Sequence, residues 1–307
     1  MKILSIGEVL WDVFDDGEYL GGAPLNFSAA SQRLGSTAAL LSAVGSDERG
    51  ARTLKAIRDL GLTTEFVQQV TQKPTGTALV STDRDGNAVF TIDRPAAFDC
   101  VLIDTLLLEQ VVCFAPDWLY FGTLAQTNPQ TEMLLMRLIK GLPKTRGYYD
   151  VNLRTGHWDL GLVKKLSSVA KVIKLNHTEA ELLYERTTGK SGYSLENFCR
   201  YWSSTFDIST ICVTLGRQGC AVFSEDALRF FNGFTVDVVD TVGSGDAFAA
   251  AFLYGLNAGW PIEENAAFAN ALGAIVAAHP GATPDWNVAE CHALIRSRSA
   301  SDTSSKS

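Results

Sequence analysis

The chain has 307 residues, of which 46% are hydrophobic and 20% charged, and its formal net charge is −8. These values describe an ordinary globule that is long enough to bury a sizeable core. The excess of acidic residues argues against an electrostatic nucleic-acid binder, which needs a basic patch, so we expect no nucleic-acid partner.

The distribution of apolar and cysteine residues bears on the compartment. The N-terminal run MKILSIGEVLWDVF is interrupted by Glu8 and Asp12, which is not typical of a signal peptide. No apolar run reaches the roughly 18 residues of a membrane span. The six cysteines form no CxxC pair and the four histidines do not cluster with them, so neither a disulfide framework nor a zinc site is predicted. We expect a cytoplasmic protein without a membrane partner.

Short apolar runs alternate along the chain with helical patterns. Strands are expected at 2–9, 38–44, 117–122, 147–151, 171–175 and 210–215. Helices are expected at 24–34, 48–60, 129–140, 159–167, 178–185 and 195–203. Strands that alternate with helices predict right-handed βαβ units, and therefore an α/β fold with a mostly parallel sheet covered on both faces.

Two segments depart from this alternation. Residues 13–20 resemble a small hairpin around Gly17, and residues 76–94 contain Asp85-Gly86, a strong hairpin signal. The two excursions predict a small antiparallel sheet beside the main one, placed to act as a lid over a site. An ordinary edge hairpin is the alternative interpretation.

We detect no internal repeat and no linker that would divide the chain. One domain is therefore expected over 1–296, with a discontinuous lid from about 12–20 and 76–95. Residues 297–307, SRSASDTSSKS, contain little to bury and predict a disordered tail.

The most informative motif is residues 240–246, DTVGSGD, followed directly by the helical run AFAAAFLYGLNAG. A helix N-terminus presents free N–H groups and the positive end of a dipole, which together bind an anion such as a phosphate. Gly243 and Gly245 let the backbone approach that anion, and Asp246 can take a proton from a hydroxyl. A simple helix cap and turn is the alternative.

Further polar residues follow other predicted strands, where ligands bind in open α/β sheets. They are Asp12, Gly22, Asn26, Asp150, Asn152, Arg154, Asn176, Glu179, Gly216 and Gly219. Each alone can be explained as a cap or a turn. Their recurrence at the ends of successive strands predicts one site.

The sequence resembles the PfkB (ribokinase-like) carbohydrate kinase family over nearly its whole length. GGAPLNFSAASQRLG at 21–35, with Gly45 beyond it, matches one family signature, and DTVGSGDAFAAAFL at 240–253 matches the other. The resemblance implies a three-layer α/β/α sandwich with a small β-sheet lid. It also implies transfer of the γ-phosphoryl of Mg-ATP to a sugar hydroxyl, without a GxxxxGK[ST] loop.

The resemblance also implies residue roles. Asp246 would be the general base, and Gly243, Ser244 and Gly245 would form the anion hole. The nucleotide would meet Asn176, Thr214, Gly216, Gly219 and Asn270, and the sugar would meet Asp12, Gly22 and Asn26. Asn176 and Glu179 would hold Mg²⁺ partly through water, and Asp240 and Thr241 lie where some members bind a monovalent cation such as K⁺.

Residues 150–158, DVNLRTGHW, are similar to a pattern of fructokinases and 2-keto-3-deoxygluconate kinases. We expect fructose as the substrate. Ketodeoxygluconate is the first alternative, since Arg94 or Arg154 would suit its carboxylate. A ribokinase or nucleoside kinase, and a catalytically inactive sugar-binding sensor, are the others. Because exposed sheet edges seek partners, a homodimer through the lid is also expected.

Overall fold

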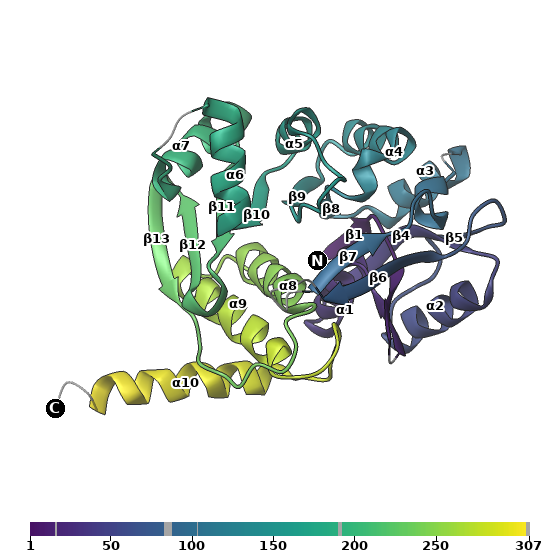
Figure 1. Ribbon diagram of the computed structural model, residues 1–307. Coiled ribbons are helices and arrows are strands. Elements are labelled where there is room, and N and C mark those ends of the chain that lie inside the picture. The colour runs from purple at the N-terminus through teal and green to yellow at the C-terminus, as the bar shows by residue number, and fades with distance from the viewer. Residues whose placement is uncertain (16, 83–87, 103, 190–191, 305–307) are drawn as a thin grey trace.

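The computed structural model describes residues 1–304 except 16, 83–87, 103 and 190–191. A nine-stranded sheet forms its centre (Figure 1). In spatial order its strands are β13 (Ala227–Asn232), β12 (Gly219–Ser224), β11 (Thr210–Thr214), β10 (Val172–Asn176), β9 (Arg146–Asp150), β8 (Trp118–Gly122), β1 (Lys2–Ile6), β4 (Thr37–Gly45) and β5 (Val67–Val70). The pairs from β11 to β5 are parallel, and β12 and β13 are antiparallel. The predicted mostly parallel sheet is confirmed.

Helices cover both faces of this sheet (Figure 1). On one side lie α1 (Ala23–Arg33), α2 (Glu48–Asp59), α8 (Ser244–Asn257), α9 (Ile262–Ala277) and α10 (Val288–Ser304). On the other lie α3 (Thr105–Phe114), α4 (Pro129–Gly141), α5 (Leu160–Ser167), α6 (His177–Thr188) and α7 (Leu195–Phe206). The three-layer α/β/α arrangement is therefore confirmed, and the six predicted helices lie within a few residues of their expected bounds.

Two cores lie on opposite faces of the sheet because successive strand residues point to opposite sides. In β1, Leu4 and Ile6 pack into the core under α3–α7, whereas Ile3 packs into the core under α1, α8 and α9. In β9, Tyr149 and Tyr148 divide between the two cores in the same way. Burial on both faces explains why these strands read as continuous apolar runs.

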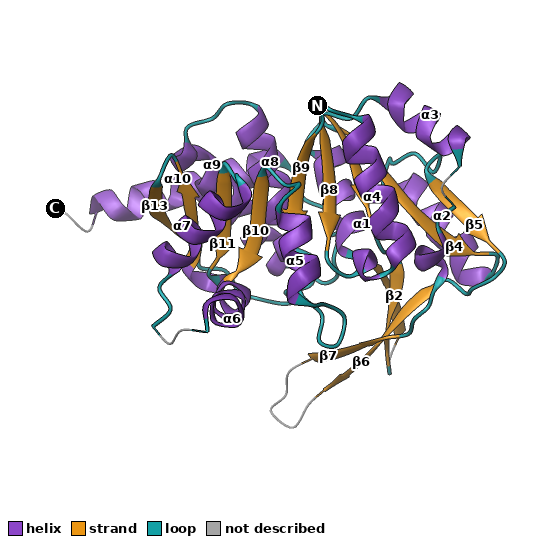
Figure 2. Cartoon of the chain, turned by 90° about the horizontal axis from the view of Figure 1, so that it is seen from above, coloured by secondary structure: helices purple, strands orange, loops and turns teal. Residues whose placement is uncertain are grey.

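A small sheet projects from the main one (Figure 2). Its order is β3 (Gly17–Gly21), β2 (Leu10–Phe14), β6 (Gly76–Thr82) and β7 (Ala88–Ile92). The two predicted hairpins are present, although the Asp85-Gly86 turn lies outside the described residues. The small sheet is antiparallel within each hairpin, as expected, whereas the two hairpins join through a parallel pairing of β2 with β6. Each is the first strand of its hairpin and enters from the same edge of the main sheet, so the two run in the same direction.

The first predicted strand, 2–9, is also shorter than expected. β1 ends at Ile6, and the chain turns at Gly7 to enter the small sheet at Leu10. A Cβ on Gly7 would lie 2.6 Å from Cγ of Pro24, so helix α1 packs closely against this turn. The turn separates the main sheet from the small one.

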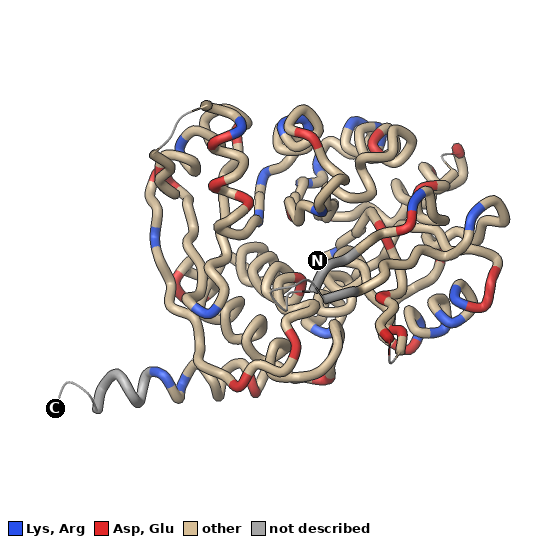
Figure 3. The backbone as a smooth tube through the Cα atoms, viewed as in Figure 1, with Lys and Arg blue, Asp and Glu red and all other residues tan. Residues whose placement is uncertain are grey.

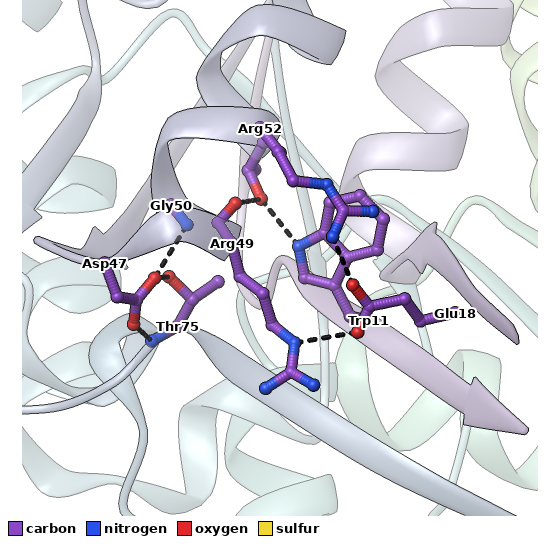
Figure 4. A network of polar contacts seen from close by, with 8 residues as sticks. Trp11, Glu18, Asp47, Arg49, Gly50, Arg52 and Thr75 are labelled. Atoms are coloured by element: carbon purple, nitrogen blue, oxygen red, sulfur yellow. Dashed lines mark hydrogen bonds and ion pairs between the residues drawn. The ribbon is translucent and has the colours of Figure 1, made fainter.

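Figure 4 shows how the hairpin of β2 and β3 is held against α2. The indole Nε1 of Trp11 donates to Oγ1 of Thr53 at 2.9 Å, and the Arg52 guanidinium lies 4.1 Å from the Trp11 ring centre. Glu18 pairs with Arg52 and accepts from Nε of Arg49 at 2.9 Å. Two arginines on one helix therefore fix one end of the small sheet.

Asp47 fixes the second hairpin at the same helix (Figure 4). Its Oδ1 accepts from the backbone N of Gly50 at 2.7 Å, which caps α2, and its Oδ2 accepts from the backbone N of Thr75 at 2.8 Å. Because Thr75 immediately precedes β6, one carboxylate connects the start of α2 to the start of that strand.

The C-terminal segment differs from the expectation of a disordered tail. Helix α10 continues through Ser304, so most of 297–307 is helical. The Arg298 guanidinium lies 4.3 Å from the Phe234 ring centre and donates to the carbonyl of Asn232 at 2.8 Å. These contacts attach the helix to the loop after β13.

Charged positions of both signs are interspersed along the described chain (Figure 3). Among the helices in the described residues, none combines the length and the apolar character needed to cross a membrane.

The core under α8 allows a matched test of packing. Phe252 in α8 is fully buried, whereas Phe230 in β13 is 64% exposed. We expect Phe252→Ala to lower the free energy of unfolding by about 3–5 kcal/mol, because it leaves a cavity among close-packed side chains. Phe230→Ala should change it by less than about 1 kcal/mol. Urea unfolding followed by fluorescence measures both, and equal effects would contradict the placement of α8 in the core.

Candidate active site

Two cavities meet at the N-terminus of α8. The smaller, of about 270 Å³, has walls from β2, β6 and β7 of the small sheet and from the carboxyl edge of the main sheet. The larger, of about 710 Å³, lies between the loop after β11 and helix α9. Thr241 and Gly245 line both cavities, so the two spaces adjoin.

The start of α8 is built to approach an anion. Gly243, its N-cap, has a φ of 77°, a left-handed conformation that favours glycine. A Cβ there would clash with the carbonyl of Ala282, which packs against this turn. With no side chain at the cap, the N–H groups of the first turn face the junction of the cavities.

Asp246 lies in that first turn and is buried. Its Oδ2 accepts from Nδ2 of Asn26 at 2.8 Å, a contact between residues 220 positions apart. Burial raises the pKa of the Asp246 carboxyl to about 6, against the opposing effect of the Lys174 ammonium. A carboxylate with this pKa is ionised at neutral pH and is a stronger base than an exposed aspartate.

Lys174 and Asp150 form a buried ion pair next to Asp246. Nζ of Lys174 lies 3.1 Å and 3.0 Å from the two carboxylate oxygens of Asp150. The hydroxyl of Tyr120 donates to the same carboxylate at 3.0 Å. Burial lowers the pKa of Lys174, but the surrounding carboxylates outweigh it and leave that pKa raised.

Two further carboxylates line the smaller cavity. Burial raises the pKa of Glu8 to about 7 and that of Asp12 to about 6, although Arg154 opposes both shifts. Oε2 of Glu8 is buried without a hydrogen-bond partner among the described residues. Arg154 and Asn152 line the same cavity. The cavity therefore presents carboxylates, an amide and a guanidinium, which suit a ligand with several hydroxyl groups.

The larger cavity is more apolar. Phe234, Val236, Val238 and Phe248 line it together with Asn270, whose Nδ2 lies 3.3 Å from the carbonyls of Phe231 and Asn232. Flat apolar walls with a few polar groups are typical of a site for a heterocyclic base.

The carboxylates expected at a metal are occupied by backbone donors. Oε1 of Glu179 accepts from the backbone N of Leu153 at 2.7 Å and Oε2 accepts from that of Asn176 at 2.8 Å. Asp240 accepts from the backbone N of Val242 at 2.9 Å and from that of Gly281 at 3.0 Å. Within the described ranges, no group of three His, Cys, Asp or Glu side chains is arranged to hold a metal.

The sequence pattern that defines the pfkB family of carbohydrate kinases matches residues 4–288 of this chain. The chain belongs to the pfkB family of carbohydrate kinases. It is 31% identical to fructokinase-1 of Oryza sativa subsp. japonica over 278 residues, which cover 86% of this chain and 84% of that protein. As a member of this family, the chain is a sugar phosphotransferase, as predicted.

Solved structures share the fold of this pfkB family member. A fructokinase with bound ATP from Xylella fastidiosa superposes with a TM-score of 0.83 at 22% identity, covering 97% of this chain and 99% of its own. A putative ribokinase II of Escherichia coli in complex with ATP and Mg²⁺ also has a TM-score of 0.83, at 19% identity, covering 96% and 99%. The ribokinase-like fold is therefore confirmed.

Most of the predicted site residues meet at these two cavities. The smaller is lined by Asp12, Gly22, Asn26, Arg154, Thr241, Gly243, Gly245 and Asp246. The larger is lined by Thr214, Gly216, Gly219, Thr241, Ser244, Gly245 and Asn270. Asn176 lies beside Thr214 and Gly216 in a neighbouring depression. Their catalytic and binding roles stay predictions.

Arg94 lies at the end of the small sheet, as expected, but its side chain has partners within the protein. It does not line the sugar-sized cavity; its guanidinium pairs with Asp99, which also accepts from Nε at 3.1 Å, and donates to the carbonyl of Leu124 at 2.8 Å. Through these partners, Arg94 connects the end of the small sheet to the loop after β8. Arg154 lines the cavity and Arg94 does not; substrate binding by either arginine stays a prediction.

Sequence reasoning missed Lys174 and Glu8 as site residues. Both carried a visible signal, because each is the single charge of an otherwise apolar run within a predicted strand, VIKL for Lys174 and ILSIGEV for Glu8. A charge in such a position is buried and must find a partner or a function.

The glycine at the cap of α8 can be tested against a glycine of the same backbone conformation. Gly243 has a φ of 77° and Gly259, at the other end of the helix, a φ of 71°, but a Cβ on Gly259 would meet nothing within 4 Å. Both alanine variants pay the same backbone cost of about 1–2 kcal/mol. We expect Gly243→Ala to lower phosphoryl transfer by on the order of 10²-fold, since it also displaces the Ala282 loop, and Gly259→Ala to retain it. Steady-state kinetics of both variants test this expectation. Equal activities would contradict the conclusion that a side chain at the Gly243 cap disturbs the site.

Proposed function

We propose that this protein is a fructokinase that transfers the γ-phosphoryl group of Mg-ATP to a hydroxyl of fructose. The observation that carries the proposal is the composition of the smaller cavity, where Glu8, Asp12 and Asp246 all project. Three carboxylates accept hydrogen bonds from the hydroxyl groups of a neutral sugar. The rice relative named fructokinase-1, at 31% identity, supports the same substrate.

In the proposed reaction, Asp246 takes the proton of the attacking sugar hydroxyl. The hydroxyl oxygen forms a bond to the γ-phosphorus, the bond from that phosphorus to the β,γ-bridging oxygen breaks, and its electron pair leaves on ADP. Asn26 orients the Asp246 carboxylate through the 2.8 Å hydrogen bond. The N–H groups near Gly243 and Gly245 stabilise the negative charge on the phosphoryl oxygens.

The cofactors of the proposal are ATP, Mg²⁺ and K⁺. Mg²⁺ keeps several waters and binds mainly substrate phosphates, so it does not require a cluster of protein carboxylates. Asn176 and Glu179 offer oxygen atoms near the nucleotide cavity and would hold the ion through water, because both Glu179 oxygens already accept backbone N–H groups. Bound there, Mg²⁺ supplies charge neutralisation for the phosphates. Asp240 and Thr241 would hold K⁺ at the turn before α8.

The negative charges of the cavity disfavour 2-keto-3-deoxygluconate as the substrate. Its carboxylate would face Glu8, Asp12 and Asp246, and of the two arginines expected to bind it, only Arg154 lines the cavity. Like charges at short range repel strongly in a partly buried site. A neutral ketose avoids that cost.

We also propose a cytoplasmic location and a homodimer formed through the small sheet. Tyr19 and Leu79 of that sheet are 54% and 57% exposed. Exposed apolar side chains beside a sheet edge are suited to contact a second copy.

A substrate panel tests the function. Release of ADP from Mg-ATP is measured with fructose, ribose, 2-keto-3-deoxygluconate, fructose 6-phosphate, adenosine and inosine. We expect kcat/KM for fructose to exceed that for every other acceptor by at least tenfold. A preference for ketodeoxygluconate that Arg154→Gln abolishes would overturn the choice of fructose and retain the kinase.

The base assignment is tested by pH and by substitution. With the pKa of Asp246 raised to about 6, kcat/KM should be constant above that pH and fall about tenfold per unit below it, because the protonated carboxyl cannot accept the hydroxyl proton. Asp246→Asn should lower kcat by about 10²–10⁴-fold and leave the affinity for ATP, measured by calorimetry, unchanged. Near-normal turnover of that variant would end the assignment.

A further inference from the structure

Lys174 occupies the boundary between the two cavities. Its Nζ lies 3.3 Å from the position that a Cβ on Gly245 would take, and Gly245 lines both cavities. The side chain comes from β10 and reaches the first turn of α8, where Asp246 also lies. A group that reaches Asp246 past Gly245 therefore lies beside this ammonium.

The ammonium is fixed in place. Nζ of Lys174 is held by both oxygens of Asp150, which in turn accepts from the hydroxyl of Tyr120 at 3.0 Å. The Tyr120 ring stacks on Phe27 with the ring centres 3.7 Å apart. Asp150 is only 1% exposed, so the whole chain of contacts is anchored in the core. A charge held in this way needs no reorganisation when a ligand arrives.

Pairing with Asp150 does not use all the donors of Lys174. An ammonium has three N–H groups and no acceptor, and the hydrogen bonds that Nζ makes within the described chain both go to Asp150. At least one N–H group is left for a ligand. The side chain lines the smaller cavity, which gives that N–H group access to the junction.

We propose that Lys174 is a further catalytic residue that contacts the phosphoryl group as it passes to the sugar, and that Asp150 is the positioning residue that aims it. The proposal rests on the proposed kinase function. As the sugar oxygen bonds to the γ-phosphorus and the bond to the ADP oxygen breaks, the Lys174 ammonium lies against the equatorial oxygens of the transferring group. It adds a fixed positive charge to the backbone N–H groups of α8 without gaining or losing a proton.

A purely structural role gives a different expectation. If Lys174 served only to neutralise the buried Asp150 carboxylate, removing both charges together would restore the site, since replacing a buried pair by neutral groups is often tolerated while breaking it is not. If Lys174 contacts the phosphoryl group, the double replacement stays inactive. The variants Lys174→Met, Asp150→Asn and the combination of both separate these cases.

Kinetics is the first measurement. We expect Lys174→Met to lower kcat by on the order of 10²–10³-fold, and the double variant to remain within about tenfold of that low value while its melting temperature rises toward that of the wild type. Lys171→Met is the matched control, because Lys171 lies in the same segment and its ion pair with Asp207 is exposed, so its kcat should be unchanged. Recovery of the double variant to near wild-type kcat would overturn the proposal.

Nucleotide binding is the second measurement and requires no sugar. Calorimetry gives the Kd of each variant for Mg-ADP and for the Mg complex of the ATP analogue with an imido β,γ-bridge. We expect the double variant to bind ADP like the wild type and the imido analogue at least tenfold more weakly, because only the analogue carries the γ-phosphoryl group. Unchanged affinity for both nucleotides would overturn the proposal. If the wild type phosphorylates no sugar in the panel, the proposed function fails, and this binding comparison still decides whether Lys174 contacts the γ-phosphoryl group.

Discussion

The contact between Asn26 and Asp246 is the constraint on which the rest of the site depends. It joins the first turn of α8 to helix α1 across 220 residues of sequence, with both side chains buried. Because the amide holds the carboxylate at one position, the helix N-terminus, the smaller cavity and the larger cavity all meet at a defined point. The close packing of the turn at Gly243 against Ala282 also fixes the position of the helix N-terminus.

The buried carboxylates of the site lower the free energy of unfolding. Glu8, Asp12 and Asp246 are acids whose pKa values are raised by burial, to about 7, 6 and 6. An acid that binds its proton more tightly when folded makes the free energy of unfolding fall as pH rises from its ordinary pKa near 4 through the raised value. At neutral pH these three carboxylates therefore oppose folding, and the two packed cores must offset that cost. Such a conflict between stability and local charge is typical of active sites.

The small sheet is held by ion pairs, a helix cap and a small apolar cluster, whereas the main sheet is held by two large cores. Glu18 with Arg49 and Arg52, and Asp47 with Thr75, attach its two hairpins to α2. These polar contacts are partly exposed, and they act together with a small buried cluster in which Leu10, Ala78 and Ile92 of the small sheet pack against Phe98 and Leu124. The small-sheet wall of the smaller cavity thus rests on a smaller apolar cluster than the main sheet does.

The sequence by itself determined the layers, most of the elements and the glycine turn at 240–246 from which α8 begins. Apolar periodicity located the strands and helices, because burial on both faces of a parallel sheet leaves a continuous apolar pattern. The glycines and the carboxylate of 240–246 indicated a helix N-terminus, because glycine permits the tight turn there and a carboxylate is favourable in the first turn of a helix. Residues at the ends of successive strands were expected to meet, and most of them line one of the two adjoining cavities.

Only the tertiary structure decided which of those polar residues face a ligand. The sequence makes Arg94 and Arg154 equal candidates for contact with a substrate. In the structure, however, Arg94 pairs with Asp99 and Arg154 lines the cavity. Lys174 reads as a single charge in a strand until β9 and β10 bring it to Asp150 and the start of α8. The parallel course of β2 and β6 likewise follows from where the chain leaves the main sheet. Partner choice among charged side chains depends on distances of a few ångströms between segments far apart in the chain, which no local pattern encodes.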